Sequence, residues 1–210
     1  FRNGALVFGG QPDALFPEFQ NGGHVRRLNA AGFQKILREM RQNNISDCIM
    51  ELSSHGLHQH RTGSARFRSA IFTNLTGDHL DYHNDMESYY QAKKILFSEL
   101  AEKNKIINID DEWGKRLHRE CGGYSLSLKD TNADFFVSDI ISSACSTEFR
   151  FRMNETKIKI QSPLIGLHNV YNVSEALAAA FLDGIPPEEL RNSMTRPFAV
   201  PGRLEYIKLK

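Results

Sequence analysis

The sequence lacks an excess of charge of either sign. It carries 26 lysines and arginines against 25 aspartates and glutamates, which gives a formal net charge of +1. A protein that binds nucleic acid nonspecifically needs a clear basic excess. We therefore expect no nucleic-acid partner.

Long hydrophobic runs are absent as well. No stretch of about 18 apolar residues occurs, so we expect no membrane span and no membrane partner. The first residues have no basic region followed by a long apolar stretch, which argues against a signal peptide. The chain begins at Phe1 rather than at a methionine, which suggests a fragment or a processed product.

The sequence contains few cysteines, and their spacing suggests no pairs. The three cysteines form no C-x-x-C pair and their number is odd: Cys48, Cys121 and Cys145. This pattern argues against a disulfide framework and favours a reducing, cytoplasmic setting. In that setting we expect the three thiols to be small buried hydrophobic groups.

The chain does contain short apolar segments that alternate with helical patterns. Apolar residues recur at helical spacing from Phe33 to Met40, and "ISDCIM" and "SAIFTNL" then indicate buried strands that end at Glu51 and near Asn74. A capping-box pattern, Asn84 with Glu87, predicts a helix over about residues 85–103. "KIINI" predicts a third strand and "DDEWGKRLHREC" the helix after it.

The C-terminal third has a different pattern. "FRFRM" and "KIKIQ" alternate apolar and polar residues around "NE", which predicts an antiparallel hairpin. A helix in "NVYNVSEALAAAFLDG" should end at Gly184, followed by a short helix in "PPEELRNSM" and a turn and strand in "VPGRLEYIKLK". The whole pattern predicts an α/β protein with a mostly parallel sheet, flanking helices and an antiparallel hairpin portion.

Polar residues gather directly after two of the predicted strands, in segments 51–61 and 74–83. Ligands of parallel α/β sheets bind beyond the carboxyl ends of the strands. The carboxylate of Glu51 suits a hard cation such as Mg²⁺, whereas His79 and His83 form an H-x3-H pair that would suit a transition metal. Taken one at a time, these residues are equally compatible with a solvated polar surface.

The joint spacing of these segments is more specific than any one of them. The segments "MELSSHGLHQHR", "FTNLTGDHLDYHNDMESYYQAKKILFSE" and "INIDDEWG", followed by "LIGLHNVYNVSEALAA" and "VPGRLE", resemble the Mur ligases of the MurE type. The resemblance covers about residues 32–210, and the "DHLDYH" block followed by "AKK" is its most specific part. It implies the central ATP-binding domain of that family, which is similar to P-loop NTPases in fold.

The resemblance implies an ATP-dependent amide ligase of cytoplasmic peptidoglycan synthesis. Such enzymes add an amino acid to a UDP-linked muramoyl dipeptide, UDP-MurNAc-L-Ala-D-Glu, through an acyl phosphate, with ATP and Mg²⁺. The form of the "SSHGLHQHR" loop is most similar to enzymes that add meso-diaminopimelate. By the same match Glu51 and His79 are Mg²⁺ ligands, and Lys93 is the lysine that CO₂ converts to a carbamate.

Further residues match the family's substrate and nucleotide sites. The positions that hold the muramoyl peptide are matched by Ser53, Gln59 and Arg61, whose side chains are suited to an anionic or amide-bearing ligand. The asparagines near adenine and ribose are matched by Asn169 and Asn172, and an arginine near the nucleotide phosphates by Arg203. We expect a supporting role in nucleotide binding for Asn74.

The chain departs from the family pattern near its start. No G-x-x-x-x-G-K-[ST] motif occurs, and Arg26 and Arg27 stand where the family has a Thr-Thr pair. Without the P-loop the phosphates have no cradle, so we expect the chain as given to release no ADP by itself. We expect three segments: residues 1–31, which match poorly, 32–203, the central domain, and 204–210, a linker to a C-terminal domain.

Two other hypotheses remain open. The first is a metal-dependent hydrolase built on the histidines, which would need at least three protein ligands for tightly bound zinc or manganese. The second is a non-catalytic binding module or remnant, which the unusual residues 1–28 make plausible.

Overall fold

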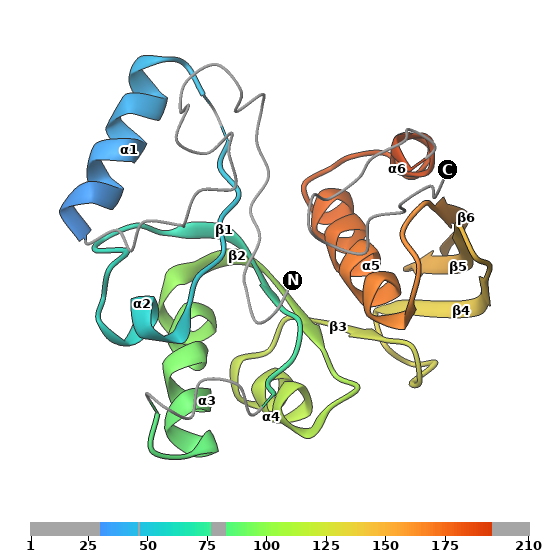
Figure 1. The fold of residues 1–210 in the computed structure, drawn as a ribbon, viewed down its shortest axis with the longest axis horizontal. Helices are drawn as coiled ribbons and strands as arrows, with labels where there is room; N and C mark the ends of the chain where they lie inside the picture. The colour runs from blue at the N-terminus through green and yellow to red at the C-terminus, as the bar shows by residue number, and fades with distance from the viewer. Residues whose placement is uncertain (1–29, 46, 77–82, 195–210) are drawn as a thin grey trace, which may run out of the picture. The chain divides into compact units, whose positions relative to one another are not determined.

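The computed structural model describes residues 30–45, 47–76 and 83–194, which are drawn in colour in Figure 1. They fall into two compact units. One contains residues 30–70 and 75–105, and the other contains residues 71–74 and 106–194. Within this described part, no helix is both long enough and apolar enough to cross a membrane.

The described strands form one sheet in which the spatial order follows the sequence. From one edge to the other these strands are β1 (Phe67–Phe72), β2 (Ala101–Asn108), β3 (Tyr124–Ser127), β4 (Phe135–Ser142), β5 (Thr147–Met153) and β6 (Thr156–Ser162). The pairs β2–β3 and β3–β4 are parallel, and the pairs β4–β5 and β5–β6 are antiparallel. The predicted α/β class, with parallel strands and an antiparallel hairpin portion, is therefore confirmed.

Helix α4 (Glu112–Cys121) connects the parallel strands β2 and β3. It begins where the Asp111 side chain accepts a hydrogen bond from the backbone N–H of Gly114, and it ends at Gly122, whose φ of 62° is left-handed. A Cβ on Gly114 would lie 1.8 Å from the carbonyl oxygen of Asn108. Only glycine therefore allows α4 to start so close to the end of β2.

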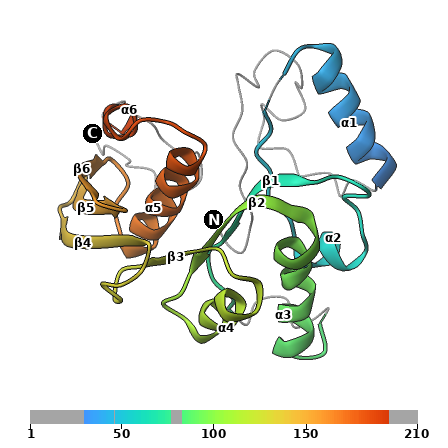
Figure 2. The same ribbon diagram turned by 180° about the vertical axis from the view of Figure 1, so that it is seen from behind.

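The β5–β6 hairpin is built on alternation. Met153 pairs with Thr156 across the turn, in which Asn154 has a φ of 51°. Phe149, Phe151 and Met153 are buried, whereas the side chain of Arg150 between them is exposed. Helix α5 (Leu167–Leu182) packs on β5, and helix α6 (Pro187–Ser193) packs on β6 and α5, as both Figure 1 and Figure 2 show.

In its described residues, the other unit contains three helices and a π-helical turn. These are α1 (Ala30–Gln42), α2 (Ser54–His58) and α3 (Met86–Ile95), and a π-helical turn η3 (Leu96–Leu100) continues α3. Tyr89, Tyr90 and Phe97 are almost completely buried, and α2 packs against α3 (Figures 1 and 2). The core of this unit therefore lies around α3, which carries the predicted Lys93.

Several predicted elements need correction. The segment "ISDCIM" is not a strand in residues 45 and 47–50, which are half-exposed to exposed instead of buried, because no described strand pairs with it. The cap of α3 is Asp85 rather than Asn84, since the Asp85 carboxylate accepts from the N–H of Ser88 at 2.7 Å. The helix gives way to β2 at Ala101, not at about 103. The predicted strand after residue 195 lies outside the described residues.

Candidate active site

Lys93 is buried on the inner face of α3. Lys93 is only 7% exposed, and its Nζ donates a hydrogen bond to the backbone carbonyl of Leu52 at 3.1 Å. The segment just before α2 and the last turn of α3 are thus connected by one lysine. Burying a charged ammonium group costs free energy, so this placement predicts that the Lys93 amine is neutral or chemically modified.

The environment of Lys93 favours the neutral amine. Burial lowers the pKa of the Lys93 ammonium from its ordinary value of 10.5 to about 8, and the negative charge of Glu51 opposes part of this shift. A larger fraction of the amine is therefore neutral near neutral pH than for a solvated lysine. A neutral amine is the form that can attack CO₂, and the resulting carbamate presents an anionic oxygen instead of an ammonium.

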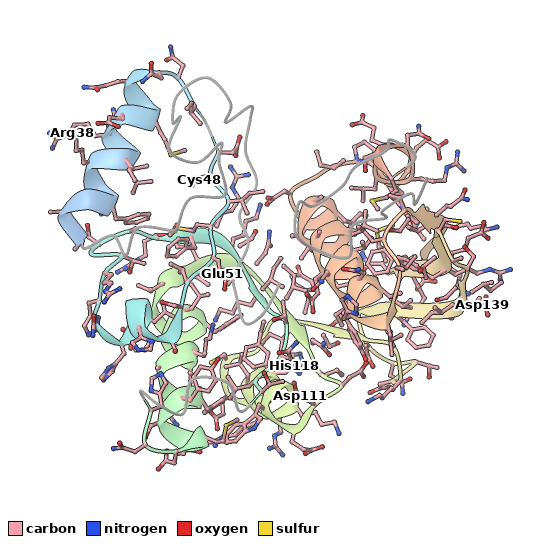
Figure 3. The ribbon with its side chains drawn as sticks, viewed as in Figure 1. Arg38, Cys48, Glu51, Asp111, His118 and Asp139 are labelled. Atoms are coloured by element: carbon pink, nitrogen blue, oxygen red, sulfur yellow. The ribbon has the colours of Figure 1, made fainter. Side chains whose placement is uncertain are left out.

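Glu51 acts on Lys93 through its charge. It is an exposed residue three positions before α2, in the chain segment that Figure 3 labels. Two of the three predicted magnesium ligands therefore interact electrostatically. The third, His79, lies outside the described residues. A carboxylate and a carbamate are both hard oxygen donors, so this pair fits Mg²⁺ once Lys93 carries CO₂.

The residues predicted to hold the muramoyl peptide surround the short helix α2. The hydroxyl of Ser53 caps this helix by accepting from the N–H of Gly56 at 3.1 Å. Gln59 ends the helix, and its Oε1 accepts from Nε and Nη2 of Arg61 at 2.9 and 2.6 Å. The structure thus brings Ser53, Gln59 and Arg61 onto one small element. Their role in binding a substrate stays a prediction.

The imidazole rings of three histidines in this region pack close to one another. His83 is buried and stacks on Tyr89 with 5.1 Å between the ring centroids, and His55 and His58 of α2 lie 5.9 and 6.3 Å from the His83 ring. Across residues 30–45, 47–76 and 83–194, no three His, Cys, Asp or Glu side chains are grouped so as to hold a metal ion. The described part of the chain therefore offers no site of the kind that the hydrolase hypothesis requires.

Asn169 and Asn172 lie in the first turns of α5. The Asn169 amide donates to the carbonyl of Ile165 at 2.8 Å, and its Oδ1 accepts from the Asn172 amide at 3.3 Å. Gly166 precedes the helix with a φ of 92° and supplies no side-chain cap. The two predicted nucleotide-binding asparagines are therefore hydrogen-bonded to each other at the start of one helix.

The structure says little about the other two residues that were predicted to bind the nucleotide. Asn74 is half-buried two positions after the end of β1. Arg203 lies outside the described residues. Glu51 and Lys93 belong to one compact unit, whereas Asn74, Asn169 and Asn172 belong to the other.

Sequence reasoning missed a polar junction at the end of β2. Asp110 accepts hydrogen bonds from the hydroxyl of Ser127, from the N–H of Leu128 at 2.8 Å and from the hydroxyl of Tyr171 at 2.7 Å. Burial, followed by the bond to Asp110, raises the pKa of Tyr171 above its ordinary value of 10. The "IDDEWG" motif contained Asp110, but nothing in the sequence paired it with a residue 61 positions away.

Glu175 is the second missed residue. It is only 2% exposed within α5, and burial raises the pKa of its carboxyl well above the ordinary value, although a hydrogen bond from the Asn108 side chain acts in the opposite direction. The sequence does place a glutamate next to an alanine-rich run. However, "EALAAA" also has the composition of an ordinary exposed helix, so it does not indicate by itself that Glu175 is buried.

With this geometry in view, comparison with known proteins identifies the family. Residues 19–180 match the Mur ligase middle domain. The chain is 38% identical over 180 residues to UDP-N-acetylmuramoyl-L-alanyl-D-glutamate–2,6-diaminopimelate ligase 1 of Clostridium acetobutylicum, an alignment covering 83% of this chain and 36% of the relative. It is 36% identical over 213 residues to the corresponding ligase of Synechococcus sp. (strain WH7803), covering 95% and 42%.

A solved structure agrees with these relatives. The structure of a UDP-N-acetylmuramoyl-L-alanyl-D-glutamate–2,6-diaminopimelate ligase superposes with a TM-score of 0.69 at 30% identity, over 76% of this chain and 34% of that one. The chain thus spans well under half the length of the relatives that it matches. Because the family match covers most of the chain, the chain belongs to the Mur ligase family, in which it corresponds to the middle domain.

Proposed function

We propose that this chain is the central part of an ATP-dependent ligase of peptidoglycan synthesis, which adds meso-diaminopimelate to UDP-MurNAc-L-Ala-D-Glu in the cytoplasm. The names of its relatives support this substrate pair. The observation that carries the proposal is the buried Lys93, which donates to the Leu52 carbonyl, is acted on by the charge of Glu51 and has a pKa lowered to about 8. A lysine on a solvated surface would be neither buried nor lowered in pKa in this way.

The proposed reaction has two balanced steps. The D-Glu carboxylate attacks the γ-phosphorus of ATP, and the bond to the β-phosphate oxygen breaks, which gives an acyl phosphate and ADP. The amine of the incoming amino acid then attacks the acyl carbon, loses a proton and expels phosphate. Catalysis of such steps consists mostly of positioning and of charge neutralisation.

We assign the residues of this chain to those tasks. Glu51, His79 and carbamylated Lys93 would hold Mg²⁺, which supplies neutralisation of the phosphate charge when bound. Arg61, whose guanidinium donates to Gln59, would pair with a carboxylate of the muramoyl peptide, and Ser53 and Gln59 would bind the same substrate. The nucleotide would be bound by Asn74, Asn169, Asn172 and Arg203. We further propose residues 32–203 as the central domain and 204–210 as the linker.

The test is CO₂ uptake at Lys93. The 210-residue chain is incubated with ¹³C-bicarbonate near pH 8, and the carbamate carbon is observed by ¹³C NMR while intact mass is measured under mild conditions. We expect one carbamate in the wild type and none in Lys93→Met. Lys94→Met, which changes the neighbouring half-buried lysine, is the matched control and should keep the signal.

Two results would contradict the assignment. One is a wild-type chain without a carbamate across a range of bicarbonate concentrations. The other is a carbamate that persists in Lys93→Met, since the modified amine would then be a different group.

A further inference from the structure

Two residues of α5 face the end of β2. Tyr171 and Glu175 are four positions apart on the helix, so their side chains project from the same face. Their partners, Asp110 and Asn108, are two positions apart where β2 ends. One helix face is therefore attached to one strand end at two points, a turn of helix apart.

The first point of attachment is the hydrogen bond between Tyr171 and Asp110. The Tyr171 hydroxyl donates to Oδ2 of Asp110 at 2.7 Å. The same carboxylate also accepts from the Leu128 N–H and from the Ser127 hydroxyl. Since Asp110 is held by the last residue of β3 and by the residue after it, the position of the Tyr171 ring is defined by groups outside its own helix.

The second point of attachment is the buried pair of Asn108 and Glu175, which are 6% and 2% exposed. The Asn108 side chain lowers the pKa of the Glu175 carboxyl, against the larger effect of burial. The Asn108 side chain is itself held in place, because its Nδ2 donates to the carbonyl of Thr73 at 2.8 Å and its Oδ1 accepts from the N–H of Asp110 at 3.0 Å. Asn108 therefore presents a fixed amide to Glu175 of α5.

The start of α5 has little else to fix it. Gly166 provides no side chain to cap the helix, and Leu167 is 56% exposed. Asn169 and Asn172 occupy this first part of α5, on either side of Tyr171 in the sequence. Their orientation therefore depends on how firmly the following turns are held.

We propose that Tyr171 and Glu175 are positioning residues, which attach α5 to Asp110 and Asn108 and thereby hold Asn169 and Asn172 in the orientation that contacts the nucleotide. The attachment itself follows from this chain's own contacts. Its purpose rests on the proposed function, in which Asn169 and Asn172 contact adenine and ribose.

The experiment uses ¹⁵N-labelled 210-residue chain and adenosine as the probe. The side-chain amide signals of Asn169 and Asn172 are assigned and followed by NMR, first without adenosine and then during a titration. Tyr171→Phe removes one hydroxyl. We expect it to shift both amide signals and to weaken adenosine binding by about three- to tenfold, as the loss of one partly buried hydrogen bond does.

Two matched comparisons separate positioning from general stability. Tyr124→Phe removes the hydroxyl of a tyrosine that is 37% exposed on β3, and it should leave the signals and the affinity unchanged. Glu175→Gln keeps an oxygen that can accept from Asn108, so it should retain affinity, whereas Glu175→Ala should lose it. Such a rescue by the isosteric variant is not expected of a residue that only fills space.

The outcomes are distinct. Unchanged Asn169 and Asn172 signals in Tyr171→Phe would overturn the proposal, whatever the affinity. Shifted signals with unchanged adenosine affinity would overturn it too, because the attachment would then have no effect on the nucleotide. A wild-type chain that binds no adenosine, while Tyr171→Phe still shifts the two amides, would refute the nucleotide role of the asparagines and leave the attachment standing.

Discussion

Lys93 shows how far a residue's environment can be foreseen. Its neighbours Tyr89, Tyr90, Leu96 and Phe97 are all buried, as the aromatic and aliphatic types of these residues indicate. The partner of its amine, the backbone carbonyl of Leu52, could not be predicted. Every residue has a backbone carbonyl, so the sequence does not indicate which one accepts the hydrogen bond. Its role as a magnesium ligand after carbamylation stays a prediction.

The lowered pKa of Lys93 predicts a specific dependence of stability on pH. The folded chain holds this proton only below a pH of about 8, whereas the unfolded chain holds it up to the ordinary pKa of 10.5. The unfolding free energy should therefore gain from Lys93 as the pH rises from about 8 to 10.5. In CO₂-free buffer, Lys93→Met should be more stable than the wild type at pH 7, by about 3 kcal/mol or less.

The difference between the two chains is measured by urea unfolding at several pH values. It should shrink as the pH approaches 10.5, since the amine is then neutral in both folded and unfolded wild type. Lys103→Met, at an exposed lysine on β2, should show no such trend. A constant difference between Lys93→Met and the wild type from pH 7 to 10.5 would contradict the depressed pKa.

Among the elements, those whose sequence pattern is local were predicted well. The β5–β6 hairpin follows from alternation around Asn154, and α5 ends as Gly184, with a φ of 95°, indicates. A strand was predicted wrongly at residues 45 and 47–50, because an apolar run forms a strand only if another strand is available to pair with it. Helix α2 was also missed, since its five residues, "SHGLH", have no helical period. Long-range pairing and short capped helices are decided by the tertiary structure.

At the start of α4, a single glycine is required by its surroundings. In Gly114→Ala the new Cβ would lie 1.8 Å from the Asn108 carbonyl oxygen, which is backbone and cannot rotate away. The first turn of α4 must then move, or Asn108 must give up its position beside Thr73. We expect Gly114→Ala to lower the unfolding free energy by about 3 kcal/mol or more, as measured by urea unfolding.

Gly122 provides the matched control at the other end of the same helix. A Cβ there meets nothing within 4 Å, but the φ of 62° is left-handed. Gly122→Ala should therefore cost only about 1 kcal/mol, from backbone strain alone. Equal losses in the two variants would mean that the close approach to Asn108 is not what requires Gly114.

For the molecule as a whole, the nearly equal numbers of basic and acidic residues do not indicate which charged side chains are buried. Most charged side chains of the described residues are exposed, as are the ion-paired Arg150 and Asp139, the latter labelled in Figure 3. Lys93 and Glu175 are the buried exceptions among the described residues. Composition could reveal neither of them, because a count of charges carries no information on burial.

Glu175 should make the stability of the whole molecule fall as the pH rises. Because its folded pKa is raised, the folded chain keeps a proton that the unfolded chain releases above a pH of about 4.5. Its stabilising contribution is therefore complete below pH 4.5 and declines toward the folded pKa, by up to about 1.4 kcal/mol per pH unit. Glu175→Gln has no proton to lose, so its unfolding free energy should exceed that of the wild type increasingly from pH 5 to pH 8.

The relevant measurement is the difference between the two chains in urea unfolding, because other groups that titrate contribute equally to both. Glu189→Gln changes an exposed glutamate of α6 and should give a difference that is independent of pH. If Glu175→Gln instead loses stability relative to the wild type as the pH rises, the carboxylate must be ionised and stabilised in the folded chain. Asn108 would then be bonded to a charged group, and the attachment of α5 to β2 would be stronger at pH 8 than at pH 5.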